Sequence, residues 1–96
     1  MKNWSDEDLI IVCEIFYQSN LALKEQKAIG MQLTGRSEGS IGMRLSNYKY
    51  LNDPTHSSGL NNPGENCIRI WGMFQREPEA MHRKAEELME KRGWLS

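Results

Sequence analysis

Two helical patterns separated by only about four residues constrain the fold of this chain more than any other feature. The first pattern spans residues 22–33 and is followed by Gly35, which can adopt the positive φ of a helix C-cap. The second spans residues 38–48 and follows Ser37, whose hydroxyl can cap a helix N-terminus. A short connection that contains glycine is typical of a helix-turn-helix unit.

The predicted helix 38–48 has three different faces, taking about 100° per residue. One face is apolar and suits burial, the second has almost no side-chain bulk, and the third can donate, accept and carry charge. The apolar face comprises Ile41, Leu45 and Tyr48, and the small-residue face comprises Gly39, Gly42 and Ser46. The third face comprises Ser40, Met43, Arg44 and Asn47. Each glycine costs a helix roughly 0.5–1 kcal/mol relative to alanine. We therefore expect a partner to approach this helix closely, and a nucleic-acid groove is the leading candidate.

The remaining patterns are also helical. Further helices are predicted at residues 6–18, 65–75 and 78–92, and the turn-forming residues 51–64 form a loop, in which Leu60 could pin the chain to the core. No strand and no repeat is indicated. The sequence therefore predicts one all-α domain over residues 1–96, a compact bundle of about five helices. Its parts are a helix-turn-helix-like core at 4–50, the loop, and two C-terminal helices at 65–92, the last of them amphipathic.

Several side chains are predicted to build the core. An inward stripe is expected from Leu9, Val12, Cys13 and Phe16, and we expect Trp4 to fold back onto the core. Cys13 and Cys67 are interpreted as buried free thiols. The last helix carries a stripe of Met81, Ala85, Leu88 and Met89, which could pack on the first helix or form a dimer contact.

The charges are unevenly distributed, although the net charge is only −1. Residues 1–20 hold one lysine against four acids, residues 21–50 hold five basic against two acidic groups, and residues 51–96 hold six against seven. The basic excess coincides with the helix-turn-helix pattern, as a local phosphate-contacting patch requires. A solvated helix face accounts for so small an excess as well.

The chemistry of common enzymes is missing from the pattern. His56 and His82 lack a cysteine or histidine at metal-ligand spacing, and no nucleophile–base arrangement or phosphate loop is indicated. No apolar run approaches the roughly 20 residues of a membrane span, and the first residues given lack the basic-then-apolar pattern of a secretory signal. We expect a cytoplasmic protein that is not an enzyme and uses no metal or cofactor.

Two family resemblances concern the same segment. Trp4-Ser5, then Gly35-Arg36-Ser37, then Ile41 and Arg44, resemble the three-helix pattern of Myb/SANT domains, whose third helix reads the major groove. Residues 4–74 are similar to the helical domain that precedes bacterial HNH endonucleases, through residues 33–48 and the later Leu51-Asn-Asp-Pro, Gly59-Leu60 and Ile70-Trp71-x-x-Phe74. This second resemblance implies a bacterial or phage DNA-binding accessory module without the nuclease. We expect the chain to be a complete small protein rather than a fragment of a longer one.

The first functional hypothesis is a helix-turn-helix-type module that binds double-stranded DNA with residues 38–48. Arg44 and Asn47 would contact base edges, Met43 lies on the same face, and the remaining site residues would hold phosphates. The predicted phosphate contacts are Lys24, Arg36, Ser37, Ser40 and Lys49. Arg36 could instead pair with Glu38 or an acid of the first helix, and Asn47 could cap helix carbonyls.

The second hypothesis is a protein-interaction module, such as a phage-encoded inhibitor or an adaptor of a larger complex. The small-residue face would then contact another helix, and a homodimer is one possible form. Four methionines would supply adaptable apolar contacts: Met43, Met73, Met81 and Met89.

Overall fold

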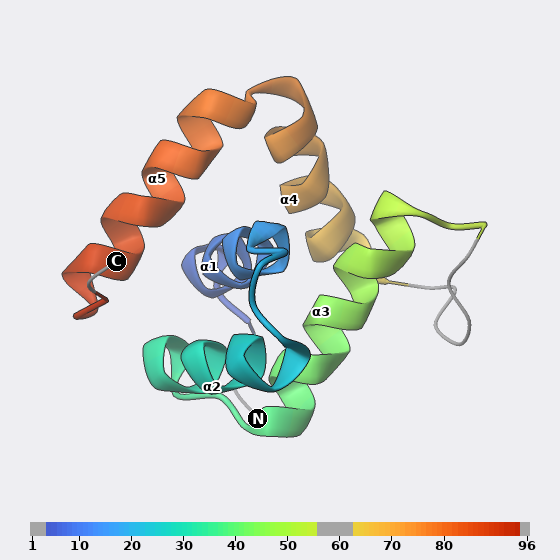
Figure 1. Ribbon diagram of the computed structural model, residues 1–96. Helices are drawn as coiled ribbons and strands as arrows, with labels where there is room; N and C mark the ends of the chain where they lie inside the picture. Colours follow the sequence, from blue (N-terminus) through green and yellow to red (C-terminus); the bar gives the residue numbers. More distant parts are fainter. Residues whose placement is uncertain (1–3, 56–62, 95–96) are drawn as a thin grey trace.

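Four helices surround a fifth, central one, as the computed structural model of residues 4–55 and 63–94 shows (Figure 1). The helices are α1 (Asp6–Tyr17), α2 (Leu23–Thr34), α3 (Glu38–Asn52), α4 (Glu65–Arg76) and α5 (Pro78–Lys91). Helix α1 packs against each of the other four. The predicted all-α bundle of about five helices is confirmed.

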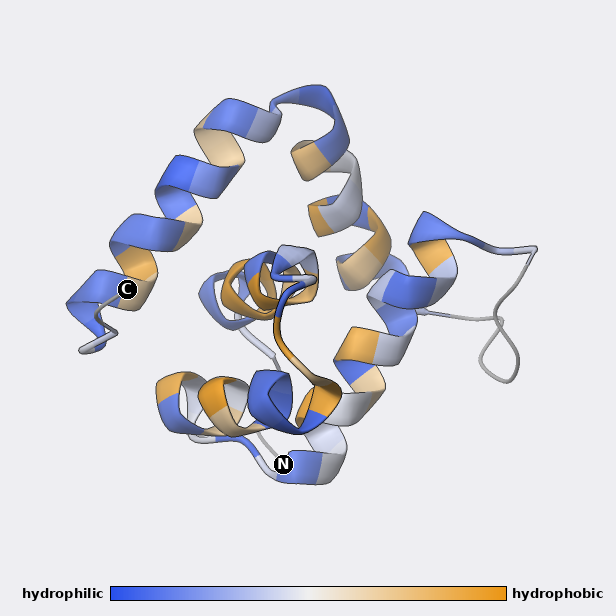
Figure 2. Cartoon of the chain, in the orientation of Figure 1, coloured by the Kyte–Doolittle hydropathy of each residue, from blue (hydrophilic) through white to orange (hydrophobic). Residues whose placement is uncertain are grey.

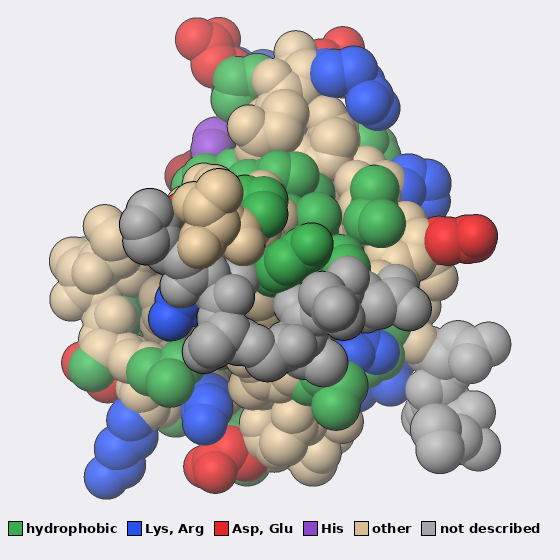
Figure 3. All heavy atoms as spheres, turned by 90° about the vertical axis from the view of Figure 1, so that its right-hand side faces the viewer, with side chains coloured by type: hydrophobic (Ala, Val, Ile, Leu, Met, Phe, Trp, Pro, Cys, Tyr) green, Lys and Arg blue, Asp and Glu red, His purple; other side chains and the backbone are tan. Residues whose placement is uncertain are grey.

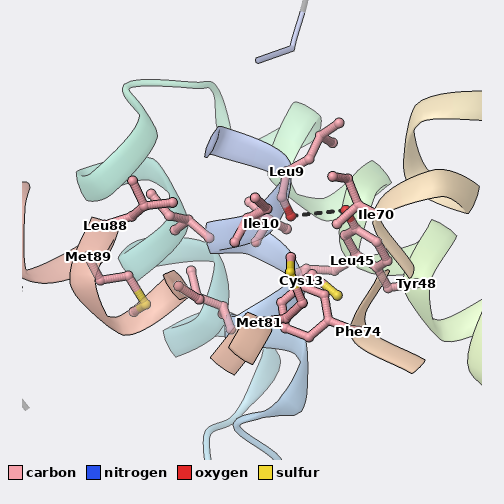
Figure 4. Close-up of a cluster of buried hydrophobic side chains, with 14 of the residues drawn as sticks. Leu9, Ile10, Cys13, Leu45, Tyr48, Ile70, Phe74, Met81, Leu88 and Met89 are labelled. Carbon is pink, nitrogen blue, oxygen red and sulfur yellow. Dashed lines mark hydrogen bonds between the residues drawn. The ribbon is translucent and has the colours of Figure 1, made fainter. Parts of the chain in front are cut away.

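Helix α1 is the core of the molecule because almost its whole surface is apolar. Eight successive residues, 8–15, are buried, and only two of them, Asp8 and Glu14, are charged. A helix that is hydrophobic all round must be covered on every side. The ribbon of Figure 2 is coloured hydrophobic along much of α1, and Figure 4 shows apolar side chains of the surrounding helices gathered against it.

The helix ends follow the local signals in the sequence. Ser5 Oγ accepts a 3.1 Å hydrogen bond from the amide of Asp8, and Ser37 Oγ accepts one of 3.2 Å from the amide of Ser40. Gly35 has φ +73°, as the C-cap interpretation of α2 requires. These bonds join residues three positions apart, so a sequence pattern can reveal them.

Helix α3 extends further than predicted, to Asn52 instead of residue 48. Tyr48 is fully buried and Leu51 packs against the core, so the apolar face continues for another turn. The connection to α4 is correspondingly shorter than the predicted loop 51–64. The expected role of Leu60 lies outside the described residues.

The predicted stripe on α5 faces the interior. The four residues, Met81, Ala85, Leu88 and Met89, are buried in the cluster around α1, so the alternative of a dimer contact is wrong. For the same reason, Met81 and Met89 cannot supply the adaptable surface contacts of the second hypothesis. Cys13 and Cys67 are buried free thiols, and Trp4 packs against the core, as predicted. No helix in the described parts of the chain is both long enough and apolar enough to span a bilayer.

Candidate nucleic-acid interface

Helix α3 lies at the side of the bundle, with one face turned away from the core (Figure 1). Ile41, Leu45 and Tyr48 point inward, as predicted, while Gly39, Met43 and Ser46 are exposed. Figure 3 looks onto this side of the molecule and shows lysine and arginine side chains, with fewer acidic ones, around a hydrophobic area. The outward face of α3 therefore combines two positions with little side-chain bulk, Gly39 and Ser46, with an exposed methionine and nearby positive charge.

One flank of this face is a lysine-bearing groove of about 600 Å³ between α2 and α3. Lys27 crosses Gly42 so closely that a Cβ atom there would lie 3.1 Å from its Cε and 3.5 Å from its Nζ. Lys49 lines the same groove, and Lys24 is exposed nearby on α2. Within the described residues, none of these three lysines forms an ion pair.

The other flank contains two arginines that share one aromatic ring. The guanidinium carbons of Arg36 and Arg44 lie 4.6 and 4.9 Å from the ring centroid of Trp4. Such distances are typical of cation–π contacts. Arg44 meets no carboxylate in the described part of the chain, so its charge is not compensated.

Arg36 is held by a buried carboxylate. Its Nε and Nη2 donate to Asp8 Oδ2 at 3.2 and 3.1 Å, which bears out the alternative that it pairs with an acid of the first helix. Arg92 Nη1 donates to Asp8 Oδ1 at 2.6 Å and to the carbonyl of Leu33 at 3.0 Å. The hydrogen bond to Asp8 raises the pKa of Arg92. Two guanidinium groups thus share one carboxylate, and Arg36 contributes less uncompensated charge than Arg44.

The two serines at the start of α3 bind each other. Ser37 Oγ donates to Ser40 Oγ at 3.1 Å and accepts from the Ser40 amide, so the capping role of Ser37 is confirmed. Ser37 is exposed and Ser40 half-buried. Both remain next to the positive end of the helix dipole, where anions are stabilised.

Asn47 corrects the sequence interpretation. It is only 4% exposed, and its Nδ2 donates to the carbonyl of Pro63 at 3.1 Å and lies 3.6 Å from Cys67 Sγ. The side chain fastens the start of α4 to α3, so its assignment to a base edge is wrong. It does not cap α3 either, because that helix continues for five more residues.

Two residues of this surface were missing from the predicted site: Lys27 and Trp4. Lys27 follows Lys24 by three positions on one helix face, so the helical period could have revealed it. The position of Trp4 under two arginines depends on contacts between α3 and the N-terminus, for which the sequence holds no local signal.

These features define a small all-α domain whose third helix is exposed between two basic flanks. The described residues contain no group of three side chains suited to hold a metal ion. No protein family matches the chain, and no curated protein or solved structure is significantly similar to it.

Proposed function

We propose that this chain is a non-enzymatic DNA-binding module of the helix-turn-helix type, with the outward face of α3 set into a duplex groove. The observation that carries the proposal is the arrangement of uncompensated cations on both sides of that face. Lys27 and Lys49 lie on one side, and Arg44 lies on the other. Because phosphates line both walls of a groove that admits a helix, cations on both flanks suit this geometry.

The same geometry favours contacts to the phosphate backbone over contacts to base edges. Asn47 is buried, and Arg44 rests on Trp4 rather than projecting from α3. Ser40 and Met43 are then the side chains best placed to meet bases, and neither offers the bidentate pairing that discriminates strongly. We therefore expect weak sequence preference and strong salt dependence. The resemblance to the helical domain of HNH endonucleases agrees with this role and stays a prediction.

Fluorescence anisotropy with a labelled 16-base-pair duplex tests the proposal at several salt concentrations. Together with Lys24, the residues Lys27, Lys49 and Arg44 make four uncompensated cations in the described chain around α3, which predict a slope of log K against log [salt] of about −3 to −4, from about 0.9 per phosphate contact. Lys27→Gln and Lys49→Gln should each reduce this slope by about 1. Lys91→Gln is the matched control, because Lys91 is exposed on α5, away from α3.

Gly39→Ala provides a sharper test of close approach. A Cβ atom at Gly39 would meet no atom of the described chain within 4 Å, so the substitution should stabilise α3 by roughly 0.5–1 kcal/mol. The added methyl group should nevertheless weaken DNA binding several-fold. Gly72→Ala on α4 is the control, since it meets only the tip of the Arg76 side chain. Unchanged affinity in Gly39→Ala, or no binding at micromolar protein in 50 mM salt, would refute the proposal.

A protein-interaction module is the second candidate. It is favoured by one observation, the apolar lining of the groove between α2 and α3. A DNA duplex offers little apolar surface that could contact these residues, whereas a protein partner does.

A further inference from the structure

The groove between α2 and α3 exposes more apolar surface than a DNA contact explains. Leu23 and Met43 on its rim are 56% and 53% exposed, and Phe16 and Leu45 contribute to its walls. Its volume of about 600 Å³ lies in the range that is typical of small-molecule and cofactor pockets, about 300–1,000 Å³. Methionine at such a rim adapts to differently shaped partners.

The charges around the groove select the kind of partner. Lys27 and Lys49 line it, Lys24 stands beside Leu23, and Glu38 is the one acid among the described lining residues. None of the three lysines is ion-paired within the described chain. A second copy of this chain would bring like charges together, whereas an acidic segment would compensate them.

We infer that the groove binds an acidic amphipathic helix of a partner protein. The helix places apolar side chains, spaced three and four residues apart, against Leu23, Met43 and the walls, and its flanking carboxylates meet Lys27 and Lys49. This is the recognition mode in which a hydrophobic groove takes the apolar face of a helix. Gly39 on the α3 side leaves room for its backbone, since a Cβ atom at this position would meet no atom of the described chain within 4 Å.

The inference adds a means of regulation to the proposed DNA-binding surface, and this part of it rests on that proposed function. The helix and the duplex would use the same lysines and the same face of α3. Their binding is therefore mutually exclusive, and an acidic partner acts as a competitive inhibitor of DNA binding.

The probe is a labelled 16-residue peptide with leucine at every third or fourth position and glutamate elsewhere, titrated by anisotropy in the absence of DNA. We expect a Kd in the micromolar range, with amide shifts of the ¹⁵N-labelled protein concentrated in α2 and α3. A peptide of identical composition, scrambled so that its leucines do not share one face, should bind at least ten-fold more weakly. Equal binding of both peptides would mean attraction by charge alone and would overturn the inference.

Variants separate this groove from the DNA contact. Leu23→Gln should weaken peptide binding at least ten-fold while DNA affinity stays within two-fold, because Leu23 carries no charge and lies outside the phosphate contacts. Ile68→Gln is the matched control, since Ile68 is 50% exposed on α4 and lies outside the groove. Lys27→Gln should weaken the binding of both the peptide and DNA. Peptide binding that is unaffected by Leu23→Gln overturns the assignment of the peptide to this groove. If the unmodified protein binds the peptide but not DNA, only the proposed function is contradicted.

Discussion

The phenolic hydroxyl of Tyr48 donates a 3.0 Å hydrogen bond to the backbone carbonyl of Leu9, deep between α3 and α1 (Figure 4). Both residues are essentially inaccessible to solvent. The bond fixes the C-terminal half of α3 to the central helix, and so holds the exposed face of α3 at a defined angle to the bundle.

Tyr48→Phe should lower the free energy of unfolding by about 1 kcal/mol, because it removes this hydrogen bond and keeps the ring. It should also change the pH dependence of stability. Burial raises the pKa of Tyr48 above its ordinary value of 10.0, so the unfolded chain loses the proton first as pH rises. The contribution of Tyr48 to stability is therefore constant below about pH 10 and falls above it. Chemical denaturation between pH 8 and 11 should show a smaller alkaline loss in Tyr48→Phe. Part of the loss should persist, since burial also raises the pKa of Cys13 and of Tyr17.

Asn47→Ala distinguishes a structural residue from a base-reading one. The substitution leaves the buried carbonyl of Pro63 without its donor, so we expect a loss of about 1–3 kcal/mol in the free energy of unfolding. The salt dependence and sequence preference of DNA binding should stay unchanged below the melting temperature. A relaxed sequence preference without loss of stability would restore Asn47 as a DNA contact.

Asp8→Asn should be far more damaging than Asp6→Asn. Asp8 is buried and accepts hydrogen bonds from Arg36 and Arg92, so its neutralisation should cost about 2–3 kcal/mol. Asp6 pairs with Arg69 on the surface, where side-chain entropy and solvent screening leave such pairs little net effect. Urea denaturation of the two variants checks the contrast, and equal losses would contradict the central role of Asp8.

Gly30→Ala should destabilise the protein although alanine favours helices. A Cβ atom at Gly30 would lie 2.7 Å from Cγ2 of Ile41, a fully buried branched side chain that cannot move aside cheaply. We expect a net loss of about 1–3 kcal/mol, typical of overpacking. Gly39→Ala, at an open position of the next helix, should stabilise instead. Thermal denaturation of the two variants compares them directly, and shifts of the same sign would contradict the packing of α2 on α3.

The five helices and most of their ends followed from the sequence because the responsible interactions are local, whereas the C-terminal end of α3 at Asn52 did not. The hydroxyls of Ser5 and Ser37 bind amides three residues away, and the isoleucines of α1 cover more than one face of that helix. Each interaction lies within one or two helical turns, so the order of the residues was enough to predict the helices. The apolar composition of α1 also indicates a helix that is covered on more than one side.

The functional surface depended on contacts between residues far apart in the chain. The packing of α4 on α3 decides whether Asn47 faces solvent or Pro63. The pairing of Arg36 with Asp8 connects the turn before α3 to the central helix α1. The position of Lys27 over Gly42 likewise depends on how α2 packs against α3. Helical period fixes the direction of a side chain about its own axis, whereas burial and charge compensation depend on what packs against it. Only the tertiary structure decided which polar residues of α3 could meet a partner.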